Sequence, residues 1–276
     1  LMMGGVALCG ALCYGELAAR FPEAGGGYVY LRQAFGRPIA FLYGWMALLV
    51  MDPGLTAALS VGLASYVGYI FNLSPAGLKL VAIGAILFVA LVNIRGVKFG
   101  GALIRWLTML KLGLLAFLII WGFGLQAGHW SNFTPLMAQR PGSDPLLGAL
   151  AGGIVGAFFS FGGWWDLSKL AGEVRDPQHT LPRALIYGVT ILTIVYIVTS
   201  ATFIYLVPLQ QVTSGETFAA QAGEVLFGRL GGQVLSGIVI VAVLGSLAAV
   251  VMSAPRVYFA MARDGFFFRA LERVHP

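Results

Sequence analysis

The stretch Gly152–Asp166 reads GGIVGAFFSFGGWWD and lies inside an apolar run that covers residues 147–173. Within it, the adjacent Gly162 and Gly163 are flanked by five aromatic residues. Glycine adopts backbone angles that other residues avoid, and it weakens the helix around it. We therefore expect an apolar helix that is broken near residues 160–166.

A helix broken inside a membrane exposes backbone carbonyl and amide groups that lipid cannot satisfy. Such groups must face protein or a water-filled cavity, which is how many secondary transporters build a substrate site. The residues leave one alternative open. Gly152, Gly156 and Gly163 could instead form a packing groove along a continuous helix.

The whole chain has the composition of a membrane protein. Of its 276 residues, 59% are hydrophobic and 10% are charged, and the mean hydropathy is +0.87. So apolar a chain has too little polar surface to cover itself in water, which excludes a soluble or disordered protein. At about 20 apolar residues per crossing, we expect an all-α integral membrane protein with one transmembrane domain over residues 1–276. Seven helices are predicted, approximately at residues 1–19, 38–71, 78–94, 105–124, 147–173, 184–207 and 231–260.

Two further spans carry irregular features. The second contains Asp52-Pro53-Gly54, and a proline inside a helix removes a backbone hydrogen bond, so we expect a kink there. The last continues through basic residues toward Phe266, and we expect this continuation to leave the bilayer and run along its surface.

The distribution of basic residues gives the orientation. Twelve of the 17 Lys and Arg residues fall in one set of alternate connections, and three fall in the opposite set. Short cytoplasmic loops carry the excess of Lys and Arg, so the first set is predicted to be cytoplasmic. The first span then runs from outside to inside, which predicts a missing upstream helix. We expect a fragment of a multi-pass protein of the cell membrane, either a plasma membrane or a bacterial inner membrane.

The sequence lacks the residues that are characteristic of several classes of function. The three histidines lie in connections without a second His one helical turn away, which argues against a metal site. No phosphate-binding loop or nucleophile elbow occurs, so we expect neither an enzyme nor a cofactor. The net charge of +6 is spread along the chain, which argues against a nucleic-acid partner.

Three ionisable residues inside the spans are candidates for function. Lys111 lies about 9 Å into its helix by the helical rise, where a charge needs a partner, a function or a path to the interface. Asp52 precedes the expected kink, and its local alternative is to bind backbone groups freed by Pro53. Asp166 follows the glycine pair, and its alternative is to cap the restarted half-helix. We treat both acids as candidates for specificity or gating.

Three ordered motifs cover most of the chain. They are ELAARFPEAGGGYVY at residues 16–30, FSFGGW at residues 159–164 and RVYFAMARDG at residues 256–265. They resemble, in order, the second helix with the first cytoplasmic loop, the broken sixth helix, and the end of the eighth helix of amino acid-polyamine-organocation (APC) transporters. EVRDP, beginning at Glu173, resembles the loop after that sixth helix. The resemblance is specific because three separate motifs agree.

The resemblance implies an inverted-repeat (LeuT-like) transporter fold of which this chain is the second to eighth helices. It implies that backbone groups of Phe159, Ser160 and Phe161 bind the amino acid substrate, with Phe159 as an aromatic gate. Gly162, Gly163 and Trp164 would shape the pocket, and Glu16 and Glu173 become further candidates for gating. FSFGGW is most similar to the L-type exchangers of neutral amino acids, whereas Trp165 and Asp166 depart from the family pattern.

The resemblance also gives Lys111 a role in coupling. Many sodium-independent relatives carry a lysine in the fifth helix, where its ammonium replaces the charge of a sodium ion. We therefore expect secondary active transport of amino acids by alternating access, as sodium-independent exchange or with proton coupling. The alternative is a membrane scaffold or assembly subunit, including a homologue that no longer transports. The expected partners are the amino acid substrate and the lipid bilayer, and the sequence does not define an accessory subunit.

Overall fold

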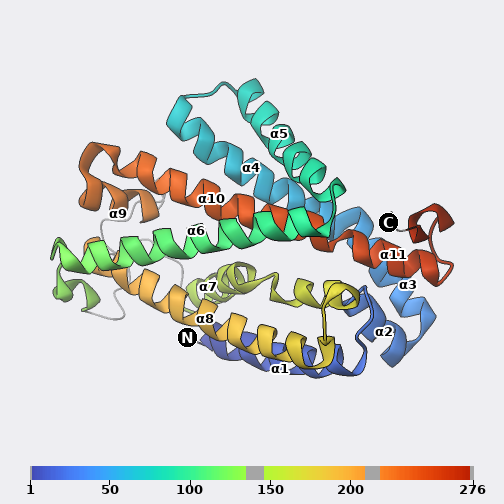
Figure 1. Cartoon of the computed structure of the whole chain (residues 1–276). Coiled ribbons are helices and arrows are strands. Elements are labelled where there is room, and N and C mark those ends of the chain that lie inside the picture. Colours follow the sequence, from blue (N-terminus) through green and yellow to red (C-terminus); the bar gives the residue numbers. More distant parts are fainter. Residues whose placement is uncertain (1, 135–145, 209–217, 274–276) are drawn as a thin grey trace. The chain divides into compact units, whose positions relative to one another are not determined.

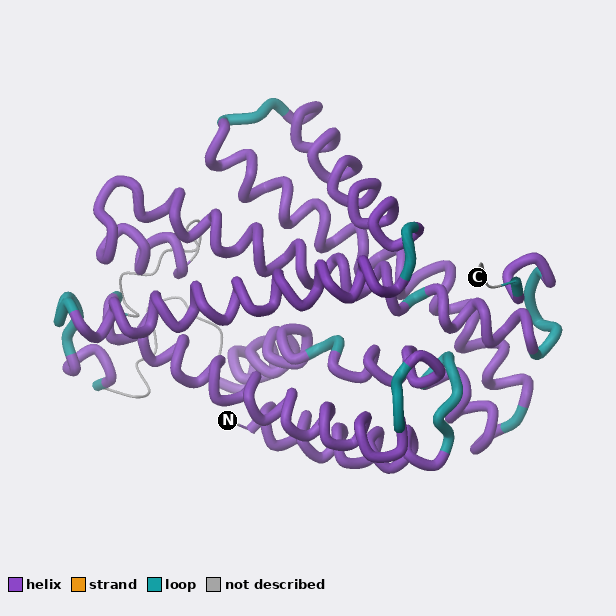
Figure 2. Tube along the Cα trace, in the orientation of Figure 1, coloured by secondary structure: helices purple, strands orange, loops and turns teal. Residues whose placement is uncertain are grey.

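The computed structural model describes residues 2–134, 146–208 and 218–273, and within these ranges it consists of helices joined by turns and short loops (Figure 2). The structure has α-helices, which Figure 1 labels, and further 3₁₀ or π segments, which are written η. They are α1 (Met2–Arg20), α2 (Gly27–Phe35), α3 (Arg37–Met46), η1 (Ala47–Met51), α4 (Asp52–Phe71), α5 (Pro75–Ile94), α6 (Val97–Gly124), η2 (Trp130–Phe133), α7 (Leu146–Phe161), η3 (Trp164–Glu173), α8 (Pro177–Leu206), α9 (Phe218–Phe227), η5 (Gly228–Leu230), α10 (Gly231–Ser253), α11 (Pro255–Arg263) and η6 (Arg269–Glu272).

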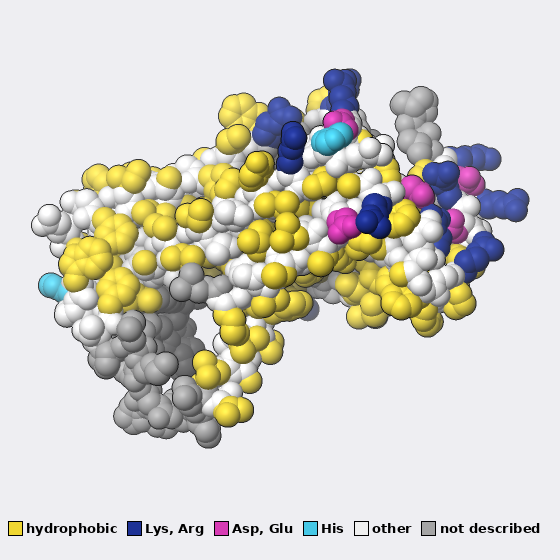
Figure 3. All heavy atoms as spheres, turned by 90° about the horizontal axis from the view of Figure 1, so that it is seen from below, with side chains coloured by type: hydrophobic (Ala, Val, Ile, Leu, Met, Phe, Trp, Pro, Cys, Tyr) yellow, Lys and Arg dark blue, Asp and Glu magenta, His cyan; other side chains and the backbone are white. Residues whose placement is uncertain are grey.

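In the described part of the chain, seven helical stretches are long and apolar enough to cross a membrane, which confirms the predicted all-helical membrane fold. They cover residues 2–20, 37–71, 75–94, 97–124, 147–173, 177–206 and 231–263. Large hydrophobic side chains lie exposed along them, among them Leu80, Ile94 and Trp106. Hydrophobic side chains cover much of the face that is drawn in Figure 3. In water this surface would be unfavourable, whereas in a bilayer it contacts lipid.

The second span is irregular just before its proline. Here α3 passes through the π-helical turn η1 into α4, whose second residue is Pro53. Because proline has no N–H, it cannot complete the hydrogen bond to the carbonyl four residues back. A widened π turn accommodates such an interruption. The disturbance expected from Pro53 is therefore present as a π turn.

The fifth span is broken at the glycine pair, as the sequence predicts. The α-helix α7 ends at Phe161, and the 3₁₀ segment η3 begins at Trp164. Between them Gly163 has φ +101°, in the left-handed region that favours glycine. The alternative of a continuous helix with a glycine packing groove is therefore wrong.

The last span also has two parts. The helix α10 ends at Ser253, and α11 begins at Pro255, where proline fits the first turn of a helix. The apolar face of α11 buries Val257 and Met261 in a hydrophobic core. Whether the residues after α11 follow the membrane surface stays a prediction.

The chain forms two compact units. The first contains residues 1–57, 152–193 and 249–276, and the second contains residues 58–151 and 194–248. The core of the first unit includes Tyr28, Leu181 and Met261. The core of the second includes Leu118 and Leu235. A single transmembrane transporter domain over residues 1–276 stays a prediction. The helix break and most of the candidate site residues belong to the first unit.

Candidate functional site

The backbone around the break is held in a tight turn. The amide of Gly162 donates to the carbonyl of Phe159 at 3.1 Å, and the amide of Asp166 donates to the carbonyl of Gly163 at 3.1 Å. A side chain at residue 162 would lie 3.1 Å from the Phe159 carbonyl, and one at residue 163 would strain the backbone because φ is positive. Since no α-helical turn follows Phe161, the last carbonyls of α7 lie outside a regular helical ladder. The sequence thus builds a turn with polar backbone inside an apolar span.

Aromatic rings line this turn. The ring of Trp164 contacts Tyr14 of α1 edge-on at 5.3 Å between centroids, and Trp165 at 5.3 Å. Trp165 in turn stacks with Phe158 at 6.3 Å. Trp164 also covers Gly10, because a Cβ there would lie 2.7 Å from its ring. The break is therefore bounded on the α1 side by an aromatic wall.

The residues expected to bind substrate differ in exposure. Phe161 is buried, whereas Phe159 is 69% exposed on the described chain. The hydroxyl of Ser160 donates to the carbonyl of Gly156 at 2.8 Å, within α7. The gating role of Phe159 and the substrate contacts of the backbone at residues 159–161 stay predictions.

Asp52 and Asp166 meet at a residue that the sequence reasoning passed over. The Lys169 Nζ lies 2.9 Å from Asp166 Oδ1 and 3.3 Å from Asp52 Oδ1, and all three side chains are largely buried. The hydroxyl of Tyr258 in α11 donates to the second oxygen of Asp52 at 2.7 Å. We call Asp52, Asp166 and Lys169 the Lys169 cluster.

This geometry corrects the local alternatives for both acids. Asp166 does not cap η3, because the N-cap residue is Gly163 and no side chain caps that end. Asp52 instead binds a lysine 117 residues away. The spacing of three residues between Asp166 and Lys169 could have suggested their pairing, since such residues share one face of a helix. Nothing local indicated Asp52 as the third member.

The two glutamates have separate partners. Glu16 pairs with Arg20 one turn further along α1 at 2.7 Å, and both side chains are mostly exposed. Glu173, at the end of η3, pairs with Arg256 of α11 at 2.7 Å. Arg256 also donates to the carbonyl of Met252. The Glu173–Arg256 pair therefore joins the segment after the break to the last span.

A second ionic network joins the first and third motifs of the sequence. Asp264 accepts from Arg32 at 2.8 Å on both carboxylate oxygens and from the hydroxyl of Tyr28 at 2.8 Å. Arg32 also pairs with Glu23 at 2.9 Å. Burial, followed by the hydrogen bond to Asp264, raises the pKa of Tyr28 above its usual value, so the hydroxyl remains a donor at neutral pH. We call Glu23, Tyr28, Arg32 and Asp264 the Asp264 network.

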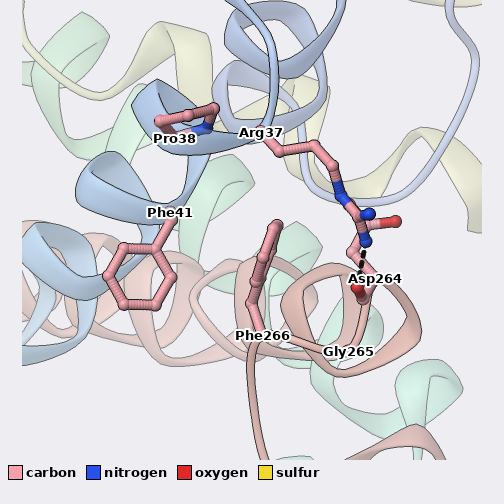
Figure 4. Close-up of a pocket in the computed structure, with 6 residues that line it drawn as sticks. All are labelled: Arg37, Pro38, Phe41, Asp264, Gly265 and Phe266. Carbon is pink, nitrogen blue, oxygen red and sulfur yellow. Dashed lines mark hydrogen bonds between the residues drawn. The ribbon is translucent and has the colours of Figure 1, made fainter.

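A pocket of about 310 Å³ opens beside this network (Figure 4). Arg37 donates to the backbone carbonyl of Asp264 at 2.9 Å, and its guanidinium lies 4.9 Å from the ring centre of Phe266. Phe41 faces the same ring at 5.6 Å. The guanidinium is thus held between a carbonyl and an aromatic face, which fixes the turn after α11 against α3.

Lys111 lies in α6, in the second compact unit, and is partly buried. Among the described residues of that unit, no acidic side chain forms an ion pair with it. Its role in coupling stays a prediction.

Comparison with known proteins gives a family for the chain. The sequence profile of a family described as "Amino acid permease" matches residues 1–276. The chain is 34% identical over 279 residues to the serine/threonine exchanger SteT of Bacillus subtilis (strain 168), covering all of this chain and 62% of that protein. It is 28% identical over 282 residues to the large neutral amino acids transporter small subunit 2 of Homo sapiens, covering 52% of that protein. It is 29% identical over 277 residues to the Asc-type amino acid transporter 1 of Mus musculus, again covering 52%. The chain thus spans between about half and two thirds of the length of these relatives, which are named as transporters and not as enzymes.

Proposed function

Because the chain belongs to the amino acid permease family of the APC superfamily, we propose that it carries the substrate site of a secondary amino acid transporter. The substrate crosses the membrane by alternating access, in which the site opens to one side at a time. The family and the seven apolar spans make the chain part of a multi-pass integral membrane protein.

The observation that carries this proposal is the helix break at Gly162 and Gly163 inside an apolar span. The carbonyl ends of a half-helix attract cations, and we assign those at residues 159–161 to the ammonium group of the amino acid. Phe159 is the aromatic side chain that we assign to closing over the bound substrate. Gly162, Gly163 and Trp164 leave room for it and shape the wall.

Two observations favour a neutral amino acid as substrate. The described side chains beside the break are mainly aromatic or small, and the nearest charged ones, Asp166 and Lys169, pair with each other. Two of the relatives above are named for serine and threonine or for large neutral amino acids. We propose sodium-independent transport with Lys111 in place of a sodium ion. No observation favours the alternative of a scaffold subunit.

Uptake measurements test this proposal. The full-length gene product is reconstituted in liposomes, and entry of labelled serine, leucine and arginine is measured with and without unlabelled amino acid inside. We expect serine or leucine to enter faster than arginine, with the same rate when sodium is replaced by choline. Absence of uptake of all three would overturn the assignment as an amino acid transporter, and a steep sodium dependence would overturn the role of Lys111.

Two glycine substitutions, at residues 163 and 156, provide a matched test of the helix break. A leucine at residue 163 is strained at φ +101°, and it favours an α-helical backbone instead. We therefore expect Gly163→Leu to lose uptake while the protein still inserts into membranes. Gly156→Leu is the control, because that glycine lies within α7, has no positive φ and has open space around it. Equal uptake in the parent and in Gly163→Leu would show that the break does not form the site.

A further inference from the structure

The Lys169 cluster is unbalanced in charge. It brings two carboxylates to one ammonium, at 2.9 and 3.3 Å. The side chains are only 7% exposed for Lys169, 10% for Asp52 and 15% for Asp166. With both acids ionised, the cluster therefore carries one negative charge in excess.

The described side chains around the cluster do not supply the missing positive charge. In the same unit, the titratable groups around the cluster are Tyr14 of α1, Tyr30 of α2, Tyr43 of α3, Tyr258 of α11 and the Glu173–Arg256 pair of η3 and α11. The four tyrosines are neutral. The guanidinium of Arg256 is already bound by Glu173, so that pair adds no net charge.

An excess charge inside a membrane span is costly. Ionisable residues at that depth pair with one another, and they often mark the paths of protons or other cations in transporters. A buried ion pair is stabilising only when the charges and hydrogen bonds around it are satisfied. One added proton makes this cluster neutral, because it turns one carboxylate into a carboxylic acid.

The cluster also holds the segment that follows the helix break. Asp166 and Lys169 belong to η3, which begins directly after Gly163. Through Lys169 this segment is tied to Asp52 at the start of α4, and through Asp52 to Tyr258 of α11. The backbone carbonyl of Lys169 accepts the amide of Gly25, in the connection after α1, at 3.1 Å. The charge state of the cluster therefore acts on how firmly η3 is held.

We propose that Asp52, Asp166 and Lys169 form a proton-binding site whose occupancy couples proton movement to the motion of η3 during transport. The proton comes from water and adds to a carboxylate oxygen, and Lys169 keeps its own proton and charge. When that carboxylate is Asp52, the ion pair that joins Lys169 to the start of α4 is replaced by a weaker contact, and η3 is held less firmly. The proton later returns to water on the opposite side, without any change in oxidation state. This inference rests on the proposed transport function and names a proton as its coupled ion.

Infrared difference spectroscopy tests the proton site without requiring transport. The purified full-length gene product is taken through a pH step, and the carbonyl stretch of a newly formed carboxylic acid is recorded. Asp52→Asn and Asp166→Asn each leave one acid paired with Lys169, so both variants should fold. We expect the band to be lost in both variants and retained in Glu16→Gln, whose side chain is exposed on α1. A band of parental size in both asparagine variants would overturn the proposal.

Transport against pH gives the second test. Over the pH range in which the cluster takes up its proton, a one-proton step changes the rate by up to about tenfold per pH unit. We expect such a profile in the parent and a profile flat within about twofold in Asp166→Asn, because its cluster is already neutral. If neither protein moves any amino acid, the transport proposal fails, and the infrared result still decides the proton site. If both transport with the same pH profile, the proton site is overturned and the transport proposal stands.

Discussion

The Lys169 cluster and the Asp264 network use the same kinds of side chain in different surroundings. Both join segments far apart in the chain through a basic residue that binds two acids, and both include a tyrosine that donates to an aspartate. The cluster lies inside spans, and its lysine is 7% exposed. In the network, Arg32 is 20% exposed and Glu23 is 49% exposed.

This difference in exposure changes what the ions can do. Water and salt screen the Asp264 network, and the guanidinium of Arg37 adds a further positive charge beside Asp264. A charge imbalance there costs little free energy, so the network serves to hold α2 against the residue that follows α11. The Lys169 cluster is not screened in this way. Its excess negative charge must therefore be balanced by a bound proton or by a movement of η3. Side-chain exposure and charge balance thus distinguish the Asp264 network, which has a structural role, from the Lys169 cluster, to which we assign coupling.

The largest effect is expected from removing the central lysine. Lys169→Met leaves two buried carboxylates without a counter-ion, and losing one partner of a buried pair costs about 3–5 kcal/mol. We expect a large loss of thermal stability and of folded protein, measured by a melting assay on the purified protein. Adding Asp166→Asn to Lys169→Met should recover part of that loss. A stable single variant would show that the cluster is much better hydrated than its burial indicates.

Lys111→Ala should distinguish the role of Lys111 from that of Lys169, the other lysine inside a span. No described acid of its own unit pairs with Lys111, so its removal leaves no unpaired partner there and should preserve the melting temperature. We expect uptake to fall by at least about tenfold, equivalent to about 1.4 kcal/mol on the barrier. Lys111→Met is the matched control for side-chain volume and should be equally inactive. Full uptake by the alanine variant would mean that this lysine only extends to the interface.

Asp264→Asn should have an intermediate effect on stability alone. The variant keeps a partner for Tyr28 but loses the charge that holds Arg32, and a hydrogen bond to a charged group contributes about 1.5–3 kcal/mol before screening. Because the network is partly exposed, we expect a loss of about 1 kcal/mol that shrinks as salt is added. The pH profile of uptake should match that of the parent. A flattened profile would give the Asp264 network the coupling role that we assign to the Lys169 cluster.

Glu16→Gln should have the smallest effect. Its partner Arg20 is one turn away and both side chains are more than 60% exposed, so the pair contributes about 0.5 kcal/mol or less. We expect stability, uptake and pH profile to remain within error of the parent values. A clear loss of uptake with unchanged stability would restore Glu16 as a gating residue.

The sequence by itself determined the features that depend on short stretches of chain. The seven spans follow from apolar runs of about 20 residues, whose burial in lipid does not depend on what they pack against. The break at Gly162 and Gly163 follows from backbone freedom at two adjacent residues. Pro53 likewise predicted an irregular helix, although the sequence did not predict that the irregularity is a π turn at residues 47–51. The family was also readable, because its motifs are contiguous.

Only the tertiary structure decided which charges meet. Lys169 was assigned no role from the sequence, and Asp52 and Asp166 were two separate candidates with local explanations. Their pairing requires the start of α4 to lie beside η3, and Tyr258 enters only because α11 packs against η3. In the same way, the first and third motifs are separate in the sequence and joined at Asp264 in the fold. Hydrophobicity and backbone strain are local properties of a chain, whereas an ion pair across 117 residues depends on the packing of whole helices.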